Sequence, residues 1–446
     1  MREYGKYRSS NPALNQYIYD MRLTILWLCL IALVSCKKEG DIQDPVIQVT
    51  NPVDGAQYDV GDTIHLVMSV SDDIELANVE VKLCDVNLTP VMPTGTITTS
   101  GTGGVLHMDY LLDDASLPTG QYYLQATCHD AANNDSRDFV ALNITEVPLE
   151  LKGIIAVTLM PGFVTAQSID TAWAASGLGT FPGDFSDAAV SSYWQQLMIT
   201  GSISGMTRCI SLDGNLAGWT VNPLPSAGPY WGKTSAHNRD WLINYRADGL
   251  IKTCSYNGTI STQYNANSGH VFRNFVFSGN YFYADMVDAT GTSRLLGVYQ
   301  GGGGATQQTT LSIDPIMLLP RDATTIYVAG NSAGQGKLLI YDYGTNGTWE
   351  PIALPAGKLL SATEIDANTL LLAMDNGNIY EFTYSPIGVL VWNAVSAQHV
   401  RYDPAQATVI TAEGSAIKQY DYPATTLMDQ ITLSDSVRDV ELWYNR

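Results

Sequence analysis

The stretch LLIYDYG, residues 338–344, is rich in the apolar and aromatic residues that favour a β-strand, and its final glycine favours a turn. Six strand-like copies of its YDYG end occur elsewhere in the chain. They are QSID (167–170), ISLD (210–213), CSYN (254–257), VYQG (298–301), FTYS (382–385) and YDYP (420–423). Successive copies are 43, 44, 44, 43, 41 and 38 residues apart, measured between their third positions. The later two thirds of the chain are therefore built from a repeat.

A repeat of roughly 40–45 residues is typical of the four-stranded blade of a β-propeller. Each repeat has a lead-in strand, an apolar strand, a glycine turn, the YDY-like strand and an irregular outer strand. In the last complete repeat the lead-in strand is 399–402 and the apolar strand is 407–411. A strand that is apolar on both faces is expected where a sheet lies between two others. Residues 150–446 are therefore predicted to form a β-propeller. Seven copies indicate seven blades, although the divergent fourth copy and the long first repeat leave six or eight open.

Residues 437–444 have the character of a lead-in strand, and we expect them to complete the blade that begins at residues 151–157. Such closure joins the two ends of a ring and removes its free sheet edges. The period and strand order resemble those of WD-repeat propellers. The Gly-His and Trp-Asp signatures of that family are missing, so the resemblance implies the architecture alone.

Residues 45–147 consist of short alternating runs separated by turn signals, which predicts an antiparallel β-sandwich. The stretch NPVDGAQYDVGDTIHLVMSVSDD (51–73) resembles the opening of bacterial Ig-like domains. ATCHDAANND (126–135) resembles their closing strand, with Ala132 in place of the usual glycine. The whole chain is thus expected to be all-β, an Ig-like sandwich followed by a propeller. No long stretch shows the apolar spacing of an amphipathic helix.

The one long apolar run, residues 23–34, is too short to span a bilayer but suits a signal peptide behind Arg22. It ends in LVSC (33–36), which resembles the lipobox of bacterial lipoproteins. That resemblance implies a signal peptide over 1–36, with a true start at Met21, and acylation of Cys36. Residues 37–44 resemble the charged tethers of Bacteroidetes surface lipoproteins. Lys37 stands where an inner-membrane retention signal would place Asp. We therefore expect a lipid anchor in the outer membrane, on its periplasmic or its cell-surface face.

The charge of the chain excludes one class of partner. Removing residues 1–35 leaves 19 basic and 42 acidic residues, a net charge of −23, and such a surface repels nucleic acid. No CxxC pair or metal-ligand spacing occurs, so we expect no metal and no cofactor. The four remaining cysteines are expected to be buried thiols: Cys84, Cys128, Cys209 and Cys254.

Few residues point to catalysis. GNSAG (330–334) matches a hydrolase nucleophile motif but lies between two predicted strands, where it is expected to be a hairpin turn. His237 and His270 bracket the third repeat and lack a metal-ligand pattern. Asp184 and Asp187 lie in a stretch, 178–189, that is expected to be a long loop capping one face of the propeller.

Aromatic residues give the stronger signal for binding. Trp173, Trp219, Tyr230 and Trp231 lie near the predicted loops of the first three repeats, where flat rings could contact a sugar or a protein. We therefore expect an outer-membrane lipoprotein that binds a protein or glycan without catalysis. The alternatives are an envelope glycan-active enzyme, a hydrolase or lyase using one propeller face, and a structural subunit of a surface assembly. Carboxylates and histidines gathered on one face would favour the enzyme, and an aromatic face would favour binding.

Overall fold

The computed structural model describes residues 42–224 and 228–446, and within them it is almost entirely β-structure. The chain divides into two compact units, Met1–Val147 and Pro148–Arg446. The all-β prediction, an Ig-like sandwich followed by a propeller, is confirmed. The expected signal peptide, Cys36 and most of the tether lie outside the described residues. Within the described part of the chain, no helix has the length and apolarity needed to cross a membrane.

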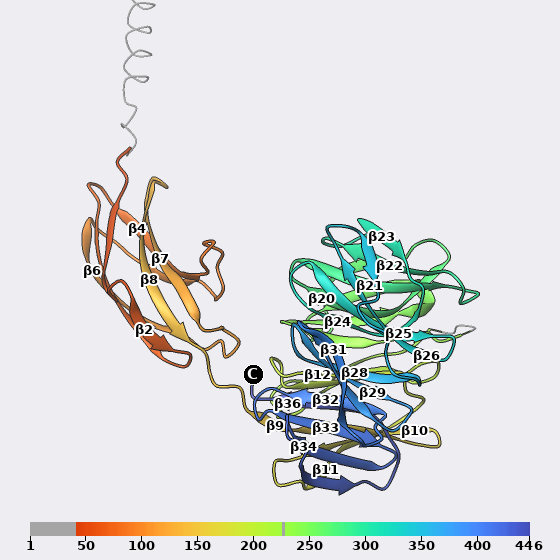
Figure 1. Ribbon diagram of the computed structural model, residues 1–446. Helices are drawn as coiled ribbons and strands as arrows, with labels where there is room; N and C mark the ends of the chain where they lie inside the picture. Colours follow the sequence, from red (N-terminus) through yellow and green to blue (C-terminus); the bar gives the residue numbers. More distant parts are fainter. Residues whose placement is uncertain (1–41, 225–227) are drawn as a thin grey trace, which may run out of the picture. The chain divides into compact units, whose positions relative to one another are not determined.

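The first unit is a sandwich of two sheets (Figure 1). One sheet has the order β1 (Val46–Asn51), β3 (Thr63–Ser71), β6 (Gly103–Leu111). The other has the order β2 (Ala56–Asp59), β8 (Asp135–Thr145), β7 (Gly120–Asp130), β4 (Leu76–Cys84), β5 (Gly95–Thr98). Strands β2 and β8 are parallel, and the other neighbours are antiparallel.

The alternation of the sequence explains how the two sheets pack. In β3 every second side chain is buried, from Ile64 through Leu66 and Met68 to Val70. These side chains share one core with residues of β4 and β7, such as Val81. Apolar residues at a period of two place one face of each sheet in this core and the other in solvent. Cys84 and Cys128 are buried free thiols here, as are Cys209 and Cys254 in the second unit, which confirms the expectation for the cysteines.

The second unit contains seven four-stranded antiparallel sheets among its described residues. The strands of the first four sheets, each given from its first strand outward, are β36 (Val437–Tyr444), β9 (Leu151–Met160), β10 (Phe163–Ile169), β11 (Ala175–Pro182); β12 (Asp187–Ser191), β13 (Gln196–Thr200), β14 (Thr207–Ser211), β15 (Trp219–Val221); β16 (Thr234–His237), β17 (Asp240–Tyr245), β18 (Leu250–Cys254), β19 (Ile260–Asn265); and β20 (His270–Ser278), β21 (Tyr281–Asp288), β22 (Arg294–Tyr299), β23 (Gln307–Thr310). The remaining three are β24 (Asp314–Pro320), β25 (Thr325–Ser332), β26 (Gln335–Asp342), β27 (Gly347–Trp349); β28 (Leu359–Asp366), β29 (Thr369–Met374), β30 (Ile379–Tyr384), β31 (Ile387–Asn393); and β32 (His399–Asp403), β33 (Thr408–Glu413), β34 (Ala416–Asp421), β35 (Leu427–Thr432). A short 3₁₀ helix, η1 (Arg246–Asp248), links β17 and β18.

The seven repeated stretches of the sequence lie at the ends of the seven third strands, from β10 to β34. The second strands are buried on both faces, and β29 shows why. Its Leu370 and Leu372 pack in a core shared with the preceding sheet, whereas Leu371 packs with Val400 and Val409 of the following sheet. A second strand therefore supplies apolar side chains to both of its neighbours, and this is why its sequence is continuously apolar.

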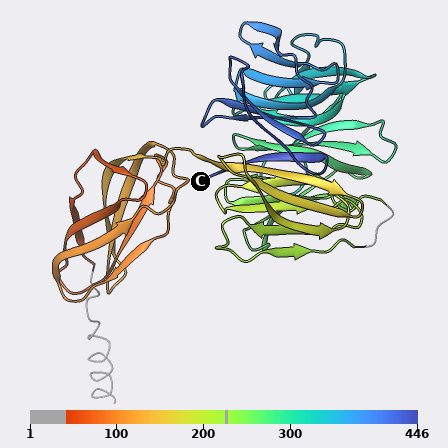
Figure 2. The same cartoon turned by 90° about the horizontal axis from the view of Figure 1, so that it is seen from below.

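The ends of this unit meet in one sheet. Strand β36 pairs antiparallel with β9, with Val440 opposite Ala156 and Leu442 opposite Ile154, and the blue and yellow strands lie side by side in Figure 2. The expected pairing of residues 437–444 with residues 151–157 is thus observed. Pairing of this kind leaves no open sheet edge at the junction of the first and last repeats.

One expectation about this region is wrong. Residues 178–189 do not form a long capping loop, because they contain the end of β11 and the start of β12. The glycines and Pro182 made the stretch resemble a loop. An outermost strand has only one hydrogen-bonded neighbour, so it tolerates such residues. Phe181 of β11 also packs against the apolar cluster that contains Ile155 and Val157.

Candidate functional site

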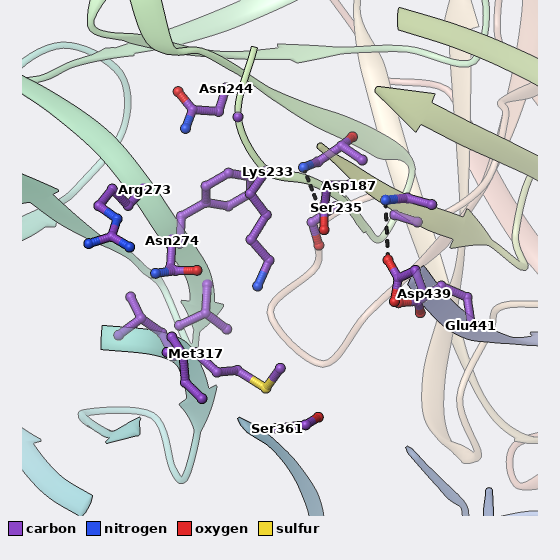
Figure 3. A pocket seen from close by; sticks show the side chains of 18 of the residues that line it. Asp187, Lys233, Ser235, Asn244, Arg273, Asn274, Met317, Ser361, Asp439 and Glu441 are labelled. Carbon is purple, nitrogen blue, oxygen red and sulfur yellow. Dashed lines mark hydrogen bonds between the residues drawn. The ribbon is translucent and has the colours of Figure 1, made fainter. Parts of the chain in front are cut away.

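A cavity of about 840 Å³ lies where the first strands of the seven sheets converge. Its lining includes residues of β12, β16, β20, β24, β28, β32 and β36. Figure 3 shows side chains from several of these strands pointing toward one open space. The volume falls in the range of ligand-binding sites, roughly 300–1,000 Å³. This central cavity is the candidate site.

Carboxylates of β12 and β36 form one side of the central cavity (Figure 3). Asp187 accepts a hydrogen bond from the backbone N–H of Thr234 at 2.8 Å. Asp439 accepts one from the N–H of Ala188 at 3.3 Å. Arg401 of β32 donates to both carboxylates of β36, over 3.3 Å to Asp439 and 2.7 Å to Glu441. The side chains thus connect the first strands of four sheets, β12, β16, β32 and β36.

The electrostatics of this acidic side favour an unusual protonation state. Burial and the neighbouring Asp439 carboxylate raise the pKa of Asp187 to about 8, so its carboxyl group is mostly protonated at neutral pH. Burial also raises the pKa of Asp439 and Glu441, and the Arg401 guanidinium opposes that rise. Burial and Arg401 lower the pKa of His399 to about 4, so its imidazole is neutral.

Cationic side chains lie just before β16, on η1 and on β20, in two neighbouring sheets. The Lys233 side chain extends into the open centre of the cavity in Figure 3. Arg246 also lines the cavity, and burial together with nearby Arg273 lowers the pKa of its guanidinium. Arg273 pairs with Asp314, and the same carboxylate oxygen lies 3.3 Å from Arg294. Two guanidinium groups thus share one carboxylate.

Two asparagines fix the backbone under the cationic side. Asn244 is fully buried and donates from Nδ2 to the carbonyl of Phe272 at 3.0 Å. Asn274 donates its backbone N–H to the buried carboxylate of Asp285 at 2.7 Å, and its Nδ2 to the carbonyl of Pro315 at 3.2 Å. These bonds join β17 to β20 and β20 to β24, so the wall that carries the cations is held in place.

The structure corrects the expectation that Tyr230 and Trp231 are exposed on a loop. Trp231 has no exposed surface and Tyr230 only 5%. The Trp231 ring lies 4.7 Å from that of Tyr245, in an apolar cluster shared by the β12–β15 and β16–β19 sheets. A large aromatic ring contributes more by filling the space between two sheets than by facing water, and this explains its burial. Neither ring offers a face to a ligand.

Trp219 and Trp173 are half-buried. The Trp219 indole donates to the carbonyl of Tyr256 at 2.7 Å, and its ring lies against Gly258. Trp173 lies in the turn after β10, with a φ of 60°, and packs at the edge of the apolar cluster that contains Ile154. Among the described residues that line the central cavity, none is one of the four aromatic candidates. A binding role for Trp173 and Trp219 stays a prediction.

The two aspartates of residues 178–189 have different roles. The Asp184 carboxylate accepts hydrogen bonds from the backbone N–H groups of Ser202, Ile203, Ser204 and Gly205, and so stabilises a turn. Asp187 points into the central cavity. The GNSAG stretch is the expected hairpin turn between β25 and β26. His237 stacks on Phe277 with 4.2 Å between ring centroids, and His270 contacts Ser293, so these two histidines have separate environments.

Most of the charged residues of the cavity were missed from the sequence. Lys233, Arg273, Arg401, Asp439 and Glu441 all stand in or next to first strands. The signal was present in the lead-in strands, where charged residues are interspersed with apolar ones, as in VRDVE (437–441). A strand that begins a blade lies next to the propeller axis, so charged residues on such strands indicate a polar central cavity.

Comparisons with known proteins agree with this architecture. The family model of the bacterial Ig domain matches residues 45–126. Solved structures of similar fold include the WD40 β-propeller domain of Doa1, at 13% identity over 59% of this chain and 88% of that chain, with a TM-score of 0.44. Apo AztD from Citrobacter koseri is 11% identical over 72% and 95% of the two chains, with a TM-score of 0.42. No curated protein sequence matches the chain significantly. The residues that match the family model lie in the β-sandwich of the first unit, and the second unit has the four-stranded sheets of a β-propeller.

Proposed function

We propose that this chain is a bacterial outer-membrane lipoprotein whose propeller binds a protein or glycan ligand, without catalysis, in its central cavity. The observation that carries the binding role is the convergence of polar and charged side chains from six of the seven sheets on one cavity of about 840 Å³, to which β24 adds apolar side chains. A cavity needed only for packing would be filled with apolar side chains, because an empty polar space in a protein interior costs free energy. The anchor rests on the lipobox-like LVSC stretch ending at Cys36.

The hydrogen bonds of the acidic side favour binding over catalysis. Arg401 engages both Asp439 and Glu441, and Asp439 is also held by the backbone of β12. A general base needs a carboxylate that is free to take a proton from a substrate. The two carboxylates of β36 are instead committed to joining neighbouring sheets, and they form a rigid, preorganised wall for a ligand.

One observation favours a second function, a glycan-active enzyme. Asp187 is mostly protonated at neutral pH and lies beside Asp439, whose carboxylate accepts a hydrogen bond from Arg401. A pair of carboxyl groups in different protonation states is the arrangement that glycoside hydrolases use for a general acid and its partner. An enzyme of this kind would turn over its ligand, whereas a binding protein would release it unchanged.

The experiment screens the detergent-solubilised, full-length protein against arrays of glycans and of peptides, alongside two variants. Ser235→Trp places a large ring in the cavity, because Ser235 is half-buried and faces it in Figure 3. Ala289→Trp adds the same ring to an exposed turn and is the matched control. We expect bound ligands to be lost from Ser235→Trp and kept by Ala289→Trp. Equal binding by both variants would overturn the cavity as the site, and chemical change of a recovered ligand would establish the enzyme instead.

A further inference from the structure

The central cavity is richer in positive charge than the chain as a whole. Five basic residues line it: Lys233, Arg246, Arg273, Arg401 and Arg438. Four acidic residues line it: Asp187, Glu364, Asp439 and Glu441. In the full sequence the ratio is reversed, with 23 basic and 44 acidic residues. The cavity at which the seven sheets converge therefore has more basic than acidic residues in its lining, although the chain as a whole is strongly acidic.

The charges of the cavity are also unequally compensated. On the acidic side, Arg401 neutralises part of the charge of Asp439 and Glu441, and Asp187 is mostly protonated. On the cationic side, the Lys233 ammonium and the Arg246 guanidinium have no hydrogen-bonded partner within residues 42–224 and 228–446. Arg273 and Arg294 share the single negative charge of Asp314. These three side chains together therefore have a net positive charge as well. Carboxylates such as Asp285 act on Lys233 and Arg273 through space, without a hydrogen bond to the Lys233 ammonium. The positive charge of the side formed by Lys233, η1 and β20 is therefore only partly balanced by the protein itself.

An excess of positive charge in a cavity attracts an anionic group. Guanidinium and ammonium groups bind carboxylates through charge-assisted hydrogen bonds, and arginine also offers a planar, two-pronged geometry. The hydrogen bonds of Asn244 and Asn274 hold the backbone of β20, which carries Arg273, in place before a ligand binds. This reduces the conformational entropy that is lost on binding.

The remaining lining indicates what carries the anionic group. Ser235, Asn274 and Ser361 place hydroxyl and amide groups around the same space (Figure 3). Such short neutral groups both donate and accept hydrogen bonds, as sugar hydroxyls require. A peptide with a free ammonium group would instead need an uncompensated carboxylate. Those of β36 are occupied by Arg401, which leaves Glu364 of β28 as the carboxylate of the described lining without an ion pair.

We infer that the central cavity binds an acidic oligosaccharide, whose uronate carboxylate is held by Lys233 and Arg246 beside Arg273 and whose hydroxyls contact the neutral polar groups of the wall. This inference rests on the proposed binding function and specifies its ligand class. The carboxylate replaces the missing counter-charge of the cationic side, and a saccharide of two or three units is small enough for a cavity of about 840 Å³.

The test uses isothermal titration calorimetry of the full-length protein with digalacturonate and with its uncharged dimethyl ester. We expect digalacturonate to bind and the ester to bind at least about tenfold more weakly, since the ester lacks the charge. Lys233→Met and Arg246→Gln should each weaken digalacturonate binding by roughly tenfold or more. Lys337→Met, which removes a surface lysine paired with Glu350, is the control and should keep full affinity. Thermal unfolding shows that each variant is folded.

Several results would overturn the inference. Equal affinity for the acid and its ester, full affinity in both cavity variants, or no binding of digalacturonate would each do so. If the protein bound an acidic peptide but no saccharide, the inference of a saccharide ligand would be rejected. The inference that the cavity binds an anionic group would stand. The cavity-filling variant Ser235→Trp distinguishes these results from failure of the proposed function. If a different ligand binds the wild-type protein but not Ser235→Trp, the cavity is still a binding site and only the inferred ligand class is wrong.

Discussion

Asp187 illustrates how one side chain can make the stability of the propeller depend on pH. Its pKa in the folded protein is about 8, against an ordinary value of 3.8, so between these two values the folded state holds a proton that the unfolded state has released. The contribution of Asp187 to stability is therefore most favourable at acidic pH and falls as the pH rises through this window. Asp439 and Glu441, whose pKa values are also raised, contribute in the same direction, and Lys233 and Arg401 oppose them.

We expect Asp187→Asn to flatten this dependence. The wild-type propeller should lose about 1–3 kcal/mol more stability between pH 5 and pH 8 than the variant does. Urea unfolding followed by tryptophan fluorescence measures it, because eight of the nine tryptophans lie in Pro148–Arg446. Asp184→Asn is the matched control of opposite sign, since backbone N–H groups outweigh burial and lower the pKa of that carboxyl. Parallel curves for wild type and Asp187→Asn would contradict the assignment.

Trp231 should act as a core residue. Because its side chain has no exposed surface, Trp231→Ala leaves a large hole between two sheets and should cost about 3–5 kcal/mol of unfolding free energy. Trp349→Ala is the comparison, since Trp349 is 41% exposed on an outer strand and its loss should cost less than about 1 kcal/mol. Calorimetric unfolding of both variants decides the matter. A Trp231→Ala protein as stable as Trp349→Ala would be incompatible with the buried position.

The contrast between Trp231 and Asp187 shows what a sequence reveals about single residues. Both stand in stretches without clear periodicity, and the sequence suggested exposed loops for both. The position of a side chain in such a stretch depends on which neighbouring sheet covers it, and that contact joins residues far apart in the chain. Trp231 packs with Met198 and Cys254, and Asp187 bonds to Thr234, so no local pattern could place either.

Among the elements, β36 has the largest expected effect on stability. Deleting residues 437–446 opens the sheet edge at β9 and removes the buried side chains of Val437 and Val440. Apolar residues that pack in the same cluster, such as Ile154 and Ile410, then become exposed. It also leaves Arg401 without its two carboxylates. Lost apolar burial at about 25 cal/mol per Å² and an unpaired buried charge should together cost several kcal/mol. We expect the truncated propeller to melt many degrees lower, as measured by calorimetry.

A second variant separates the strand from its charges. Asp439→Asn with Glu441→Gln keeps β36 and its pairing but removes the negative charge beside Arg401. It should destabilise the propeller, but less than the deletion does. A truncated protein that melts within a degree or two of the full chain would show that β36 does not close the ring.

The secondary-structure elements were predicted from the sequence more accurately than the positions of single side chains. The repeated third strands, the doubly apolar second strands and the closing role of residues 437–444 all followed from the sequence, because each has a period or a composition of its own. Strand β11 did not, since glycine and proline are tolerated at a sheet edge and hide the strand pattern. The charged first strands were found as strands, but the sequence did not show that their polar faces converge.

At the scale of the whole molecule, the anchor remains the main prediction. We expect Cys36→Ala to move the protein from the membrane fraction to the soluble periplasmic fraction, or to leave an uncleaved precursor, because no acyl chain can then be attached. Fractionation and metabolic labelling with a fatty acid measure both effects. Cys29→Ala, in the same apolar stretch, is the matched control and should fractionate as wild type does. Unchanged membrane association and acylation of Cys36→Ala would reject the lipoprotein.

The pairing of β36 with β9 also sets the order in which the molecule can be completed. Strand β9 ends at Met160 and β36 begins at Val437, so 276 residues must follow β9 before its partner exists. A chain that crosses a membrane from its N-terminus delivers β9 early and β36 last. The sandwich can fold as soon as its residues emerge, whereas the propeller must wait with an unpaired edge, which is the state most prone to aggregation. The export that we propose for this protein would thus include a period in which the propeller is prone to aggregation, and this period would end when β36 arrives.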